Sequence, residues 1–426
     1  MKSQGGILMN NKIYLCIDLK SFYASVECVE RGLDPFKINL VVADPTRGGG
    51  AITLAATPAI KQLGVPSRGR IYEIPKDIEY ITATPRMTLY MQYSAKIYSI
   101  FLKFVSCEDI HVYSIDESFL DITSYLSLYK MNAKQLAKTI IDEIYNVTGI
   151  TATVGIGTNL FLAKVALDIT AKHAKDFMGY LDEDLFKQLI WHHTPITDVW
   201  MIGPGTANRL AALGIKDLYG VAHYDEKILY KIFGVNAEYL IDHAWGKEQT
   251  EISDIKAYRP SSNSISNSQI LFEDYNYKDA YLIMKEMVET NVLQLTEKHL
   301  VSNHISLFIG YSKNIIKPTR GSRKITNTTN SYRILLEEFK LLYKKVVNPN
   351  YPIRQIAISF GNVIDEIYEQ YDLFADYDDV EKEKRVQKAL VDIRSKYGKN
   401  AVLKGMNFYD KATQRKRNGL VGGHNA

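Results

Sequence analysis

Two adjacent carboxylates, Asp116 and Glu117, are the residues of this chain best suited to chemistry. Serines flank the pair, and the surrounding segment, residues 110–122, is largely apolar. Like charges in a partly desolvated site repel each other unless a cation lies between them. Carboxylate oxygens suit a hard ion such as Mg²⁺, which keeps room for water or phosphate oxygens. The pair indicates a metal site, or else a turn between strands that carries solvated acids.

A third acid, Asp18, follows an apolar segment near the start of the chain. Residues 11–17 are predicted to form a buried strand, and residues 24–31 a helix. An acid at the end of a buried strand, with aromatic residues after it, is where a site on a sheet usually opens. The alternative is a helix N-cap. A third acid in a similar setting strengthens the metal-site interpretation of the first two.

Composition bounds the rest of the interpretation. The chain has 426 residues, 46% of them hydrophobic, which predicts two to four domains with ample core. We expect no membrane span and no export signal. Three cysteines without a CxxC pair argue against a disulfide framework and a zinc site, and they fit the cytoplasm. A net charge of +4 is too small to prove a nucleic-acid partner.

Strands and helices alternate through residue 175. Strands are predicted at 38–43, 51–56, 78–83 and 151–156, and helices at 58–63, 85–105, 133–147 and 160–170. This order predicts an α/β or α+β core with helices packed on a sheet.

Residues 182–250 are mostly helical in pattern, with Gly203 and Gly205 in a tight turn. Glycines between two short helices leave backbone N–H groups free to hold a DNA phosphate without reading bases. The pattern is typical of a helix-hairpin-helix, and an ordinary helical turn is the alternative.

After a polar linker at 251–258, the predicted order is β-α-β-β-α-β, the ferredoxin-like arrangement. Seven lysines or arginines and no acid lie between Lys298 and Leu336. We expect this basic surface to hold a nucleic-acid backbone, although a solvated loop is the alternative. The candidate DNA contacts are Lys313, Lys317, Arg320, Arg323 and Lys324.

The segment Gln370 to Phe374 has a polar anchor followed by two adjacent apolar residues, Leu373 and Phe374. A peptide of this kind suits docking in a partner's groove, and chance composition in a linker is the alternative. Residues 381–397 are predicted to form a charged helix.

Three motifs together resemble those of the Y-family DNA polymerases, in the order and spacing of that family. They are residues 18–27 (DLKSFYASVE), residues 114–118 (SIDES), and the VGIG sequence of 154–157 that leads to Ala163 and Lys164. The likeness covers roughly residues 11–375. Residues 264–268 and the Gly-Gly-His at 422–424 are similar to the UmuC-like bacterial subgroup.

The resemblance implies a multidomain α+β fold shaped as a right hand. Its palm would be 11–37 and 84–176, its small fingers 38–83, its helical thumb 177–250, its little finger 259–365, and its clamp-binding and C-terminal tail 366–426.

The resemblance also implies that Asp18, Asp116 and Glu117 are catalytic and gather around two Mg²⁺ ions, with the Leu19 carbonyl as a further ligand.

Nucleotide-binding residues follow from the same resemblance. They are Phe22, Tyr23, Lys61 and Lys164, with Tyr23 as the steric gate that excludes ribonucleotides. Lys61 stands where the family more often has arginine. Pro58 stands where many members have a tyrosine that binds the phosphates, so that contact must be absent or made elsewhere.

The implied function is template-directed, low-fidelity DNA synthesis across damaged bases, with dNTP and primer-template DNA as substrates. Gln370, Leu373 and Phe374 would bind the bacterial sliding clamp, and we expect a monomer. The alternatives are a non-catalytic clamp and DNA adaptor, a helix-hairpin-helix repair nuclease, and a palm-type nucleotide cyclase. The cyclase would not explain the thumb turn or the basic last domain.

Overall fold

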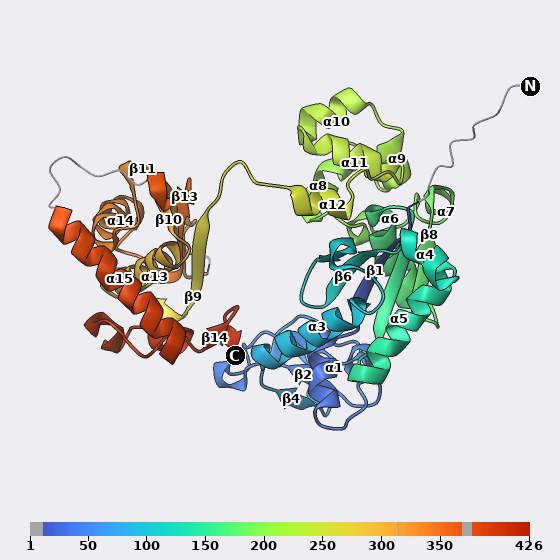
Figure 1. Cartoon of the computed structure of the whole chain (residues 1–426), viewed down its shortest axis with the longest axis horizontal. Coiled ribbons are helices and arrows are strands. Elements are labelled where there is room, and N and C mark those ends of the chain that lie inside the picture. Colours follow the sequence, from blue (N-terminus) through green and yellow to red (C-terminus); the bar gives the residue numbers. More distant parts are fainter. Residues whose placement is uncertain (1–11, 314, 369–376) are drawn as a thin grey trace, which may run out of the picture. The chain divides into compact units, whose positions relative to one another are not determined.

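A computed structural model describes residues 12–313, 315–368 and 377–426 (Figure 1). The chain forms two compact units, one reaching to residue 258 and including 424–426, the other comprising 259–423. No helix within the described ranges is long and apolar enough to cross a membrane.

The first unit is built on a five-stranded sheet of order β5-β6-β1-β7-β8. Its strands are β1 (Tyr14–Leu19), β5 (Ile110–Val112), β6 (Glu117–Asp121), β7 (Ala152–Gly157) and β8 (Met178–Leu181). The central strand β1 pairs antiparallel with both β6 and β7, and all of its apolar side chains are buried. Because β8 pairs with β7, this sheet extends through Leu181, beyond the boundary at 176 predicted for the palm.

The helices that accompany this sheet in the sequence are α1 (Phe22–Val29), α3 (Met87–Phe101), α4 (Thr123–Tyr129), α5 (Ala133–Thr148) and α6 (Leu160–Val165), the last continuing through the π-helical turn η4 (Ala166–Thr170). Of these, α5 and α6 contact β7, and α6 also contacts β1. Helix α6 lies unusually close to β7, because a Cβ on Gly155 would stand 2.1 Å from the Ala163 carbonyl oxygen. The glycines of the VGIG sequence therefore allow α6, which carries Lys164, to contact the sheet directly.

A small three-stranded sheet, β3-β2-β4, forms the region predicted as fingers. It consists of β2 (Leu40–Val42), β3 (Ala55–Ala56) and β4 (Ile81–Ala83), with α2 (Pro58–Gln62). Its core is correspondingly small, around Val41, Ile60 and Val65.

A helical cluster follows β8 and shares a hydrophobic core with α6. It contains α7 (Glu183–Leu189), α8 (Pro204–Ala211), α9 (Leu218–Ala222), α10 (Glu226–Phe233) and α11 (Asn236–Ala244). The predicted linker at 251–258 is instead mostly helical, as α12 (Ile252–Ala257). Its polar side chains suggested a linker, but Ile252 is buried against Tyr14 and Phe119 and fastens this segment to the first unit.

The second unit has the predicted β-α-β-β-α-β order. Its elements are β9 (Ile265–Tyr275), α13 (Tyr277–Glu297), β10 (Leu300–Tyr311), β11 (Thr319–Thr329), α14 (Tyr332–Val346) and β12 (Ile353–Gly361). The sheet order is β11-β10-β12-β9, so the two strands of each β-α-β unit lie on either side of one strand from the other unit. Both helices pack on one face of the sheet (Figure 1).

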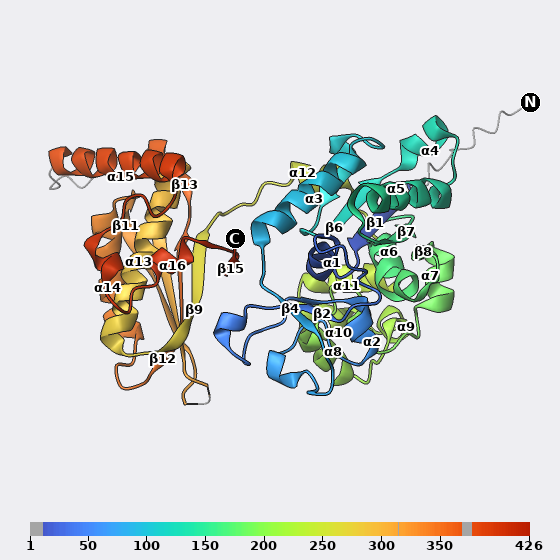
Figure 2. The ribbon, with the colours of Figure 1, turned by 90° about the horizontal axis from the view of Figure 1, so that it is seen from below.

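The C-terminal region through residue 423 is part of this second unit and not a separate tail, which differs from the predicted boundary at 365/366. Helix α15 (Tyr377–Tyr397) packs on α13, and the short helix α16 (Gln414–Arg417) lies beside α13 and β9 (Figure 2). The buried carboxylate of Glu286 in α13 accepts hydrogen bonds from Asn407 and from the backbone of Thr413 and Gln414. Local sequence could not predict this, because the partners are more than 120 positions apart.

Short elements complete the chain. They are the strands β13 (Ile364–Asp365), β14 (Leu420–Val421) and β15 (His424–Asn425), and the 3₁₀ turns η1 (Pro45–Arg47), η2 (Ile71–Glu73), η3 (Cys107–Asp109), η5 (Ala171–His173), η6 (Ile196–Asp198), η7 (Glu366–Tyr368) and η8 (Gly405–Phe408).

Candidate active site

Asp18 and Glu117 lie directly opposite each other in the antiparallel register of β1 and β6. Opposite residues of a strand pair project their side chains from the same face of a sheet. The backbone N–H of Leu19 donates to the Asp116 carbonyl oxygen over 2.9 Å, which places the third acid at the same end of β1. The strand runs through Leu19, and Ser21 occupies the N-cap position of α1, so the N-cap interpretation of Asp18 is wrong.

The electrostatics of this cluster show that its negative charge is incompletely neutralised. The pKa of Asp18 is raised to about 7, mainly by burial and also by the charges of Asp116 and Glu117, while the charge of Lys172 acts in the opposite direction. The nearest cation to Asp18 is Lys172, whose Nζ lies 3.9 Å from Oδ2. A carboxyl group in such a position favours a positive neighbour.

The other two acids are held by hydrogen bonds. Glu117 accepts from Lys164 Nζ at 2.8 Å and from the buried Cys16 Sγ at 3.1 Å, while Asp116 accepts from Ser114 Oγ at 2.5 Å. Within the described ranges no three acid, histidine or cysteine side chains converge as a ready set of ion ligands. The donors themselves, three carboxylates and a backbone carbonyl on neighbouring strands, have the chemistry that Mg²⁺ requires.

Lys164 is nearly inaccessible, since only 7% of its surface is exposed. It bridges Glu117 and Asp168, the latter at 3.0 Å. The structure therefore places this predicted nucleotide-binding lysine beneath the acids as part of their support.

Lys172 is the cation that the sequence interpretation did not assign to the site. Its side chain is 45% exposed, and it donates to Asp168 at 2.7 Å. Asp168 thus pairs with both lysines. It lies in the π-helical turn η4, and such turns are frequent at functional sites. The signal in the sequence is the spacing of eight residues between Lys164 and Lys172, which a helix brings to one face.

Lys61 also approaches the acids. Its Nζ donates to Ser21 Oγ at 2.8 Å, directly after β1, and Ser21 has the left-handed φ of 52°. Burial lowers the pKa of Lys61, and the charge of Asp18 acts in the opposite direction. The predicted lysine is therefore brought next to the predicted acid.

Tyr23 stacks on Tyr90 of α3, with ring centroids 4.5 Å apart and planes 20° from parallel. Burial raises the pKa of Tyr23, and the charge of Asp116 adds to the shift, so its ring lies within the field of the acids. Phe22 is buried at 2% exposure and packs against both tyrosines. The side chain of Phe22 is thus part of the core, and the predicted nucleotide contact of this residue stays a prediction.

In the helical cluster, Gly203 caps the N-terminus of α8 and Gly205 lies in its first turn. Both are exposed, and a Cβ at either position would meet nothing within 4 Å. This helix terminus is therefore open to an approaching group.

In the second unit the predicted basic residues divide between two faces of β11. Arg320 and Lys324 project from the face opposite the helices, together with Ser322, because side chains alternate along a strand. Arg323 projects toward the helices and pairs with Glu338 of α14 at 2.5 Å, and its predicted DNA contact stays a prediction. Lys313 and Lys317 are exposed in the loop before β11. Gln370, Leu373 and Phe374 lie outside the described residues.

Comparison with known proteins identifies the family. Residues 17–168 match the model of the impB/mucB/samB family, and residues 262–373 match that of its C-terminal domain. A Bacillus subtilis (strain 168) relative that carries the name UV-damage repair protein UvrX is 32% identical over 97% of this chain and 97% of its own length. DNA polymerase IV 2 of the same organism is 27% identical over 98% of this chain and all of its own.

Among solved structures, a Y-family DNA polymerase chimera of Dbh and Dpo4 shares the fold with a TM-score of 0.62. It is 22% identical, and the match covers 83% of this chain and 99% of the chimera. From the sequence matches and the shared fold together, the chain belongs to the impB/mucB/samB family, that is, to the Y-family DNA polymerases.

Proposed function

We propose that this chain transfers deoxynucleotides to a primer 3′ end at the site formed by Asp18, Asp116 and Glu117. As a Y-family member it is a DNA-directed DNA polymerase of translesion synthesis. The observation that carries the assignment of these residues is the register of β1 and β6, which brings acids from two distant motifs to one end of the sheet.

The three carboxylates and the Leu19 carbonyl would hold two Mg²⁺ ions, since hard oxygen donors suit this ion. When bound, such a pair lowers the pKa of the primer hydroxyl and neutralises charge on the triphosphate. The chain's own contribution is orientation. Lys164 holds the Glu117 carboxylate from the buried side, and Ser114 orients Asp116.

The incoming triphosphate would be bound by Lys61 and Lys172, because these two lysines lie beside Asp18 and are less enclosed than Lys164. Lys172 also pairs with Asp168, but its side chain is 45% exposed, whereas Lys164 is enclosed between Glu117 and Asp168. The Tyr23 ring, supported by Tyr90, would lie against C2′ of the sugar and clash with a ribose hydroxyl.

DNA contacts would come from two surfaces, each within its own unit. The exposed N-terminus of α8 offers backbone N–H groups to a phosphate. Arg320 and Lys324 supply cations on the open face of the second unit's sheet. Low fidelity follows from small fingers, because few side chains press on the nascent pair and discrimination rests on base pairing.

Sliding-clamp binding through Gln370, Leu373 and Phe374 stays a prediction. Such a tether would raise the effective concentration of the enzyme at a primer end. Leu373→Ala with Phe374→Ala should abolish clamp capture while leaving basal synthesis unchanged, and equal capture by both proteins would reject the docking role. Residence in the cytoplasm and a monomeric state are proposed on the same family basis.

The test is extension of a labelled primer with Mg²⁺ and dNTPs. Asp116→Ala with Glu117→Ala should reduce extension to below roughly one thousandth, because the ligands that stabilise the developing charge are removed. Glu143→Ala changes a half-buried acid on α5 that pairs with Lys103; it is the matched control and should extend normally. Shortening of the primer would instead indicate the repair nuclease, and tight DNA binding without extension by the unmodified chain would indicate the adaptor.

A further inference from the structure

The second unit contains a cavity of about 630 Å³ between β9, α13, α15 and the C-terminal segment 398–423. This volume lies in the range of about 300–1,000 Å³ that is typical of small-molecule sites. None of the residues that surround it belongs to the proposed polymerase site. The cavity therefore needs a separate explanation.

Arg417 of α16 is the most unusual residue of its wall. The guanidinium donates to the side-chain oxygens of Gln269 and Asn267, at 2.9 and 2.8 Å. Both acceptors are neutral amides, and no ion pair of Arg417 with a carboxylate occurs in the part of the chain that the structure describes. Burial lowers the pKa of this guanidinium, and the through-space charge of Glu286 opposes the shift. Glu286 is itself committed to Asn407 and Thr413.

A largely buried cation without an anion is costly, so its retention points to an anionic ligand. A guanidinium has five N–H donors in a planar fork, and two of them are accounted for by the amides. The remaining donors match the spacing of phosphate oxygens.

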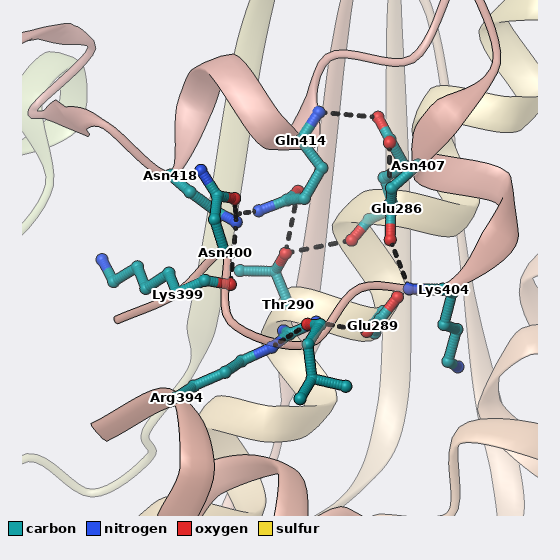
Figure 3. Close-up of polar contacts among 11 residues, drawn as sticks. Glu286, Glu289, Thr290, Arg394, Lys399, Asn400, Lys404, Asn407, Gln414 and Asn418 are labelled. Atoms are coloured by element: carbon teal, nitrogen blue, oxygen red, sulfur yellow. Dashed lines mark hydrogen bonds and ion pairs between the residues drawn. The ribbon is translucent and has the colours of Figure 1, made fainter. Parts of the chain in front are cut away.

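The rest of the wall complements such a ligand. The second arginine, Arg394, is neutralised by Glu289 at 2.9 Å and frames the cavity, while Lys399 is exposed at its rim (Figure 3). Gln414 and Asn418 also line the cavity and are joined by a 2.5 Å hydrogen bond between their side-chain amides (Figure 3). Leu293 and Val391 add apolar surface beside these polar groups. Glu297 is the one carboxylate among the described lining residues.

We infer that this cavity binds a phosphate-bearing ligand of mononucleotide size, with the phosphate on Arg417 and Lys399. The amides and the apolar surface would contact the sugar and base. The same chemistry is offered by a free nucleotide and by the 5′-phosphorylated end of a single strand. The site does not use the acids of the first unit, so the inference does not rest on the proposed nucleotidyl transfer.

The experiment titrates the full chain with three probes. EDTA is present throughout, so that metal-dependent binding at Asp18, Asp116 and Glu117 is suppressed. The probes are dCMP, a 5′-phosphorylated hexathymidylate, and the same hexamer without its terminal phosphate, measured by calorimetry. We expect dCMP or the phosphorylated hexamer to bind, and Arg417→Gln to weaken that binding at least about ten-fold, because a charge-assisted phosphate contact is lost. Binding of dCMP identifies a free nucleotide, and a preference for the phosphorylated hexamer over both other probes identifies a strand end.

Arg415→Gln is the matched control, since Arg415 lies in the same short helix but stacks over Phe408. It should bind as the unmodified chain does. If Arg417→Gln does not fold, Lys399→Gln tests the same site from its exposed rim and should weaken binding less strongly but measurably. No binding of any probe up to 10 mM, equal affinity with and without Arg417, or an equal loss in both arginine variants would overturn the inference.

Discussion

At the scale of single residues, the candidate active site depends on a carboxylate that does not face it. Glu27 is fully buried and accepts hydrogen bonds from Arg86 at 2.9 and 2.8 Å, from the Tyr90 hydroxyl at 2.8 Å, and from Arg31. Burial alone would raise the pKa of Glu27, but these hydrogen bonds lower it. Tyr90 is therefore fastened at its hydroxyl while its ring supports Tyr23.

This arrangement predicts a graded effect on sugar selection. Tyr23→Ala should lower the preference for dCTP over CTP by roughly 100-fold, and Tyr90→Ala by roughly ten-fold, because the second change removes only the support of the gate. Tyr90→Phe keeps the stacked ring and should change the preference little. The measurement is the ratio of kcat/KM for the two nucleotides. Unchanged exclusion of CTP by Tyr23→Ala would refute the gate assignment.

At the scale of elements, the attachment of the helical cluster to α6 includes a buried histidine and the carboxylate that it hydrogen-bonds. His243 of α11 lies stacked on Phe161 of α6, with centroids 4.0 Å apart, and hydrogen-bonds Glu248 at 3.0 Å. Although burial opposes its charge, hydrogen bonds from His243 and Thr250 lower the pKa of Glu248 to about 2, from an ordinary 4.5. A carboxyl with a depressed pKa stabilises the fold above pH 4.5, and this stabilisation is lost as the pH falls toward 2.

We therefore expect Glu248→Gln to lower the free energy of unfolding at pH 7, and the difference from the unmodified chain to shrink between pH 4.5 and pH 2. Urea unfolding at a series of pH values measures it. A difference that stays constant down to pH 2.5 would show that the carboxylate carries no such linkage.

At the scale of the whole molecule, the chain's last segment is a structural part of its second unit. Residues 398–423 are fastened to α13 through Glu286, which is 1% exposed, and to β9 through Arg417. Glu286→Ala should lower the stability of this unit by about 3 kcal/mol, because two buried backbone N–H groups lose their charged acceptor. Limited proteolysis should then cut within 398–423. Glu297→Ala, an exposed acid on the same helix, is the control, and equal protection of both variants would contradict the prediction.

The sequence by itself determined the elements and the chemical types of the site. Hydrophobic periodicity and the signals that end helices are local features of the sequence, so α5, β7 and α6 begin within a residue of their predicted positions. The identities of Asp18, Asp116 and Glu117 likewise needed only the motifs.

Tertiary structure decided what depends on contacts between distant residues. The pairing of β1 with β6 sets which acids face each other, and the close packing of α6 on Gly155 buries Lys164 and leaves Lys172 accessible. Because side chains alternate along β11, Arg323 points toward the helices and not toward the open face of the sheet. The burial of Ile252 attaches the polar segment 251–258 to the core of the first unit. A local sequence pattern indicates which residues can be buried. The residue that packs against or neutralises each of them is determined only by the tertiary structure.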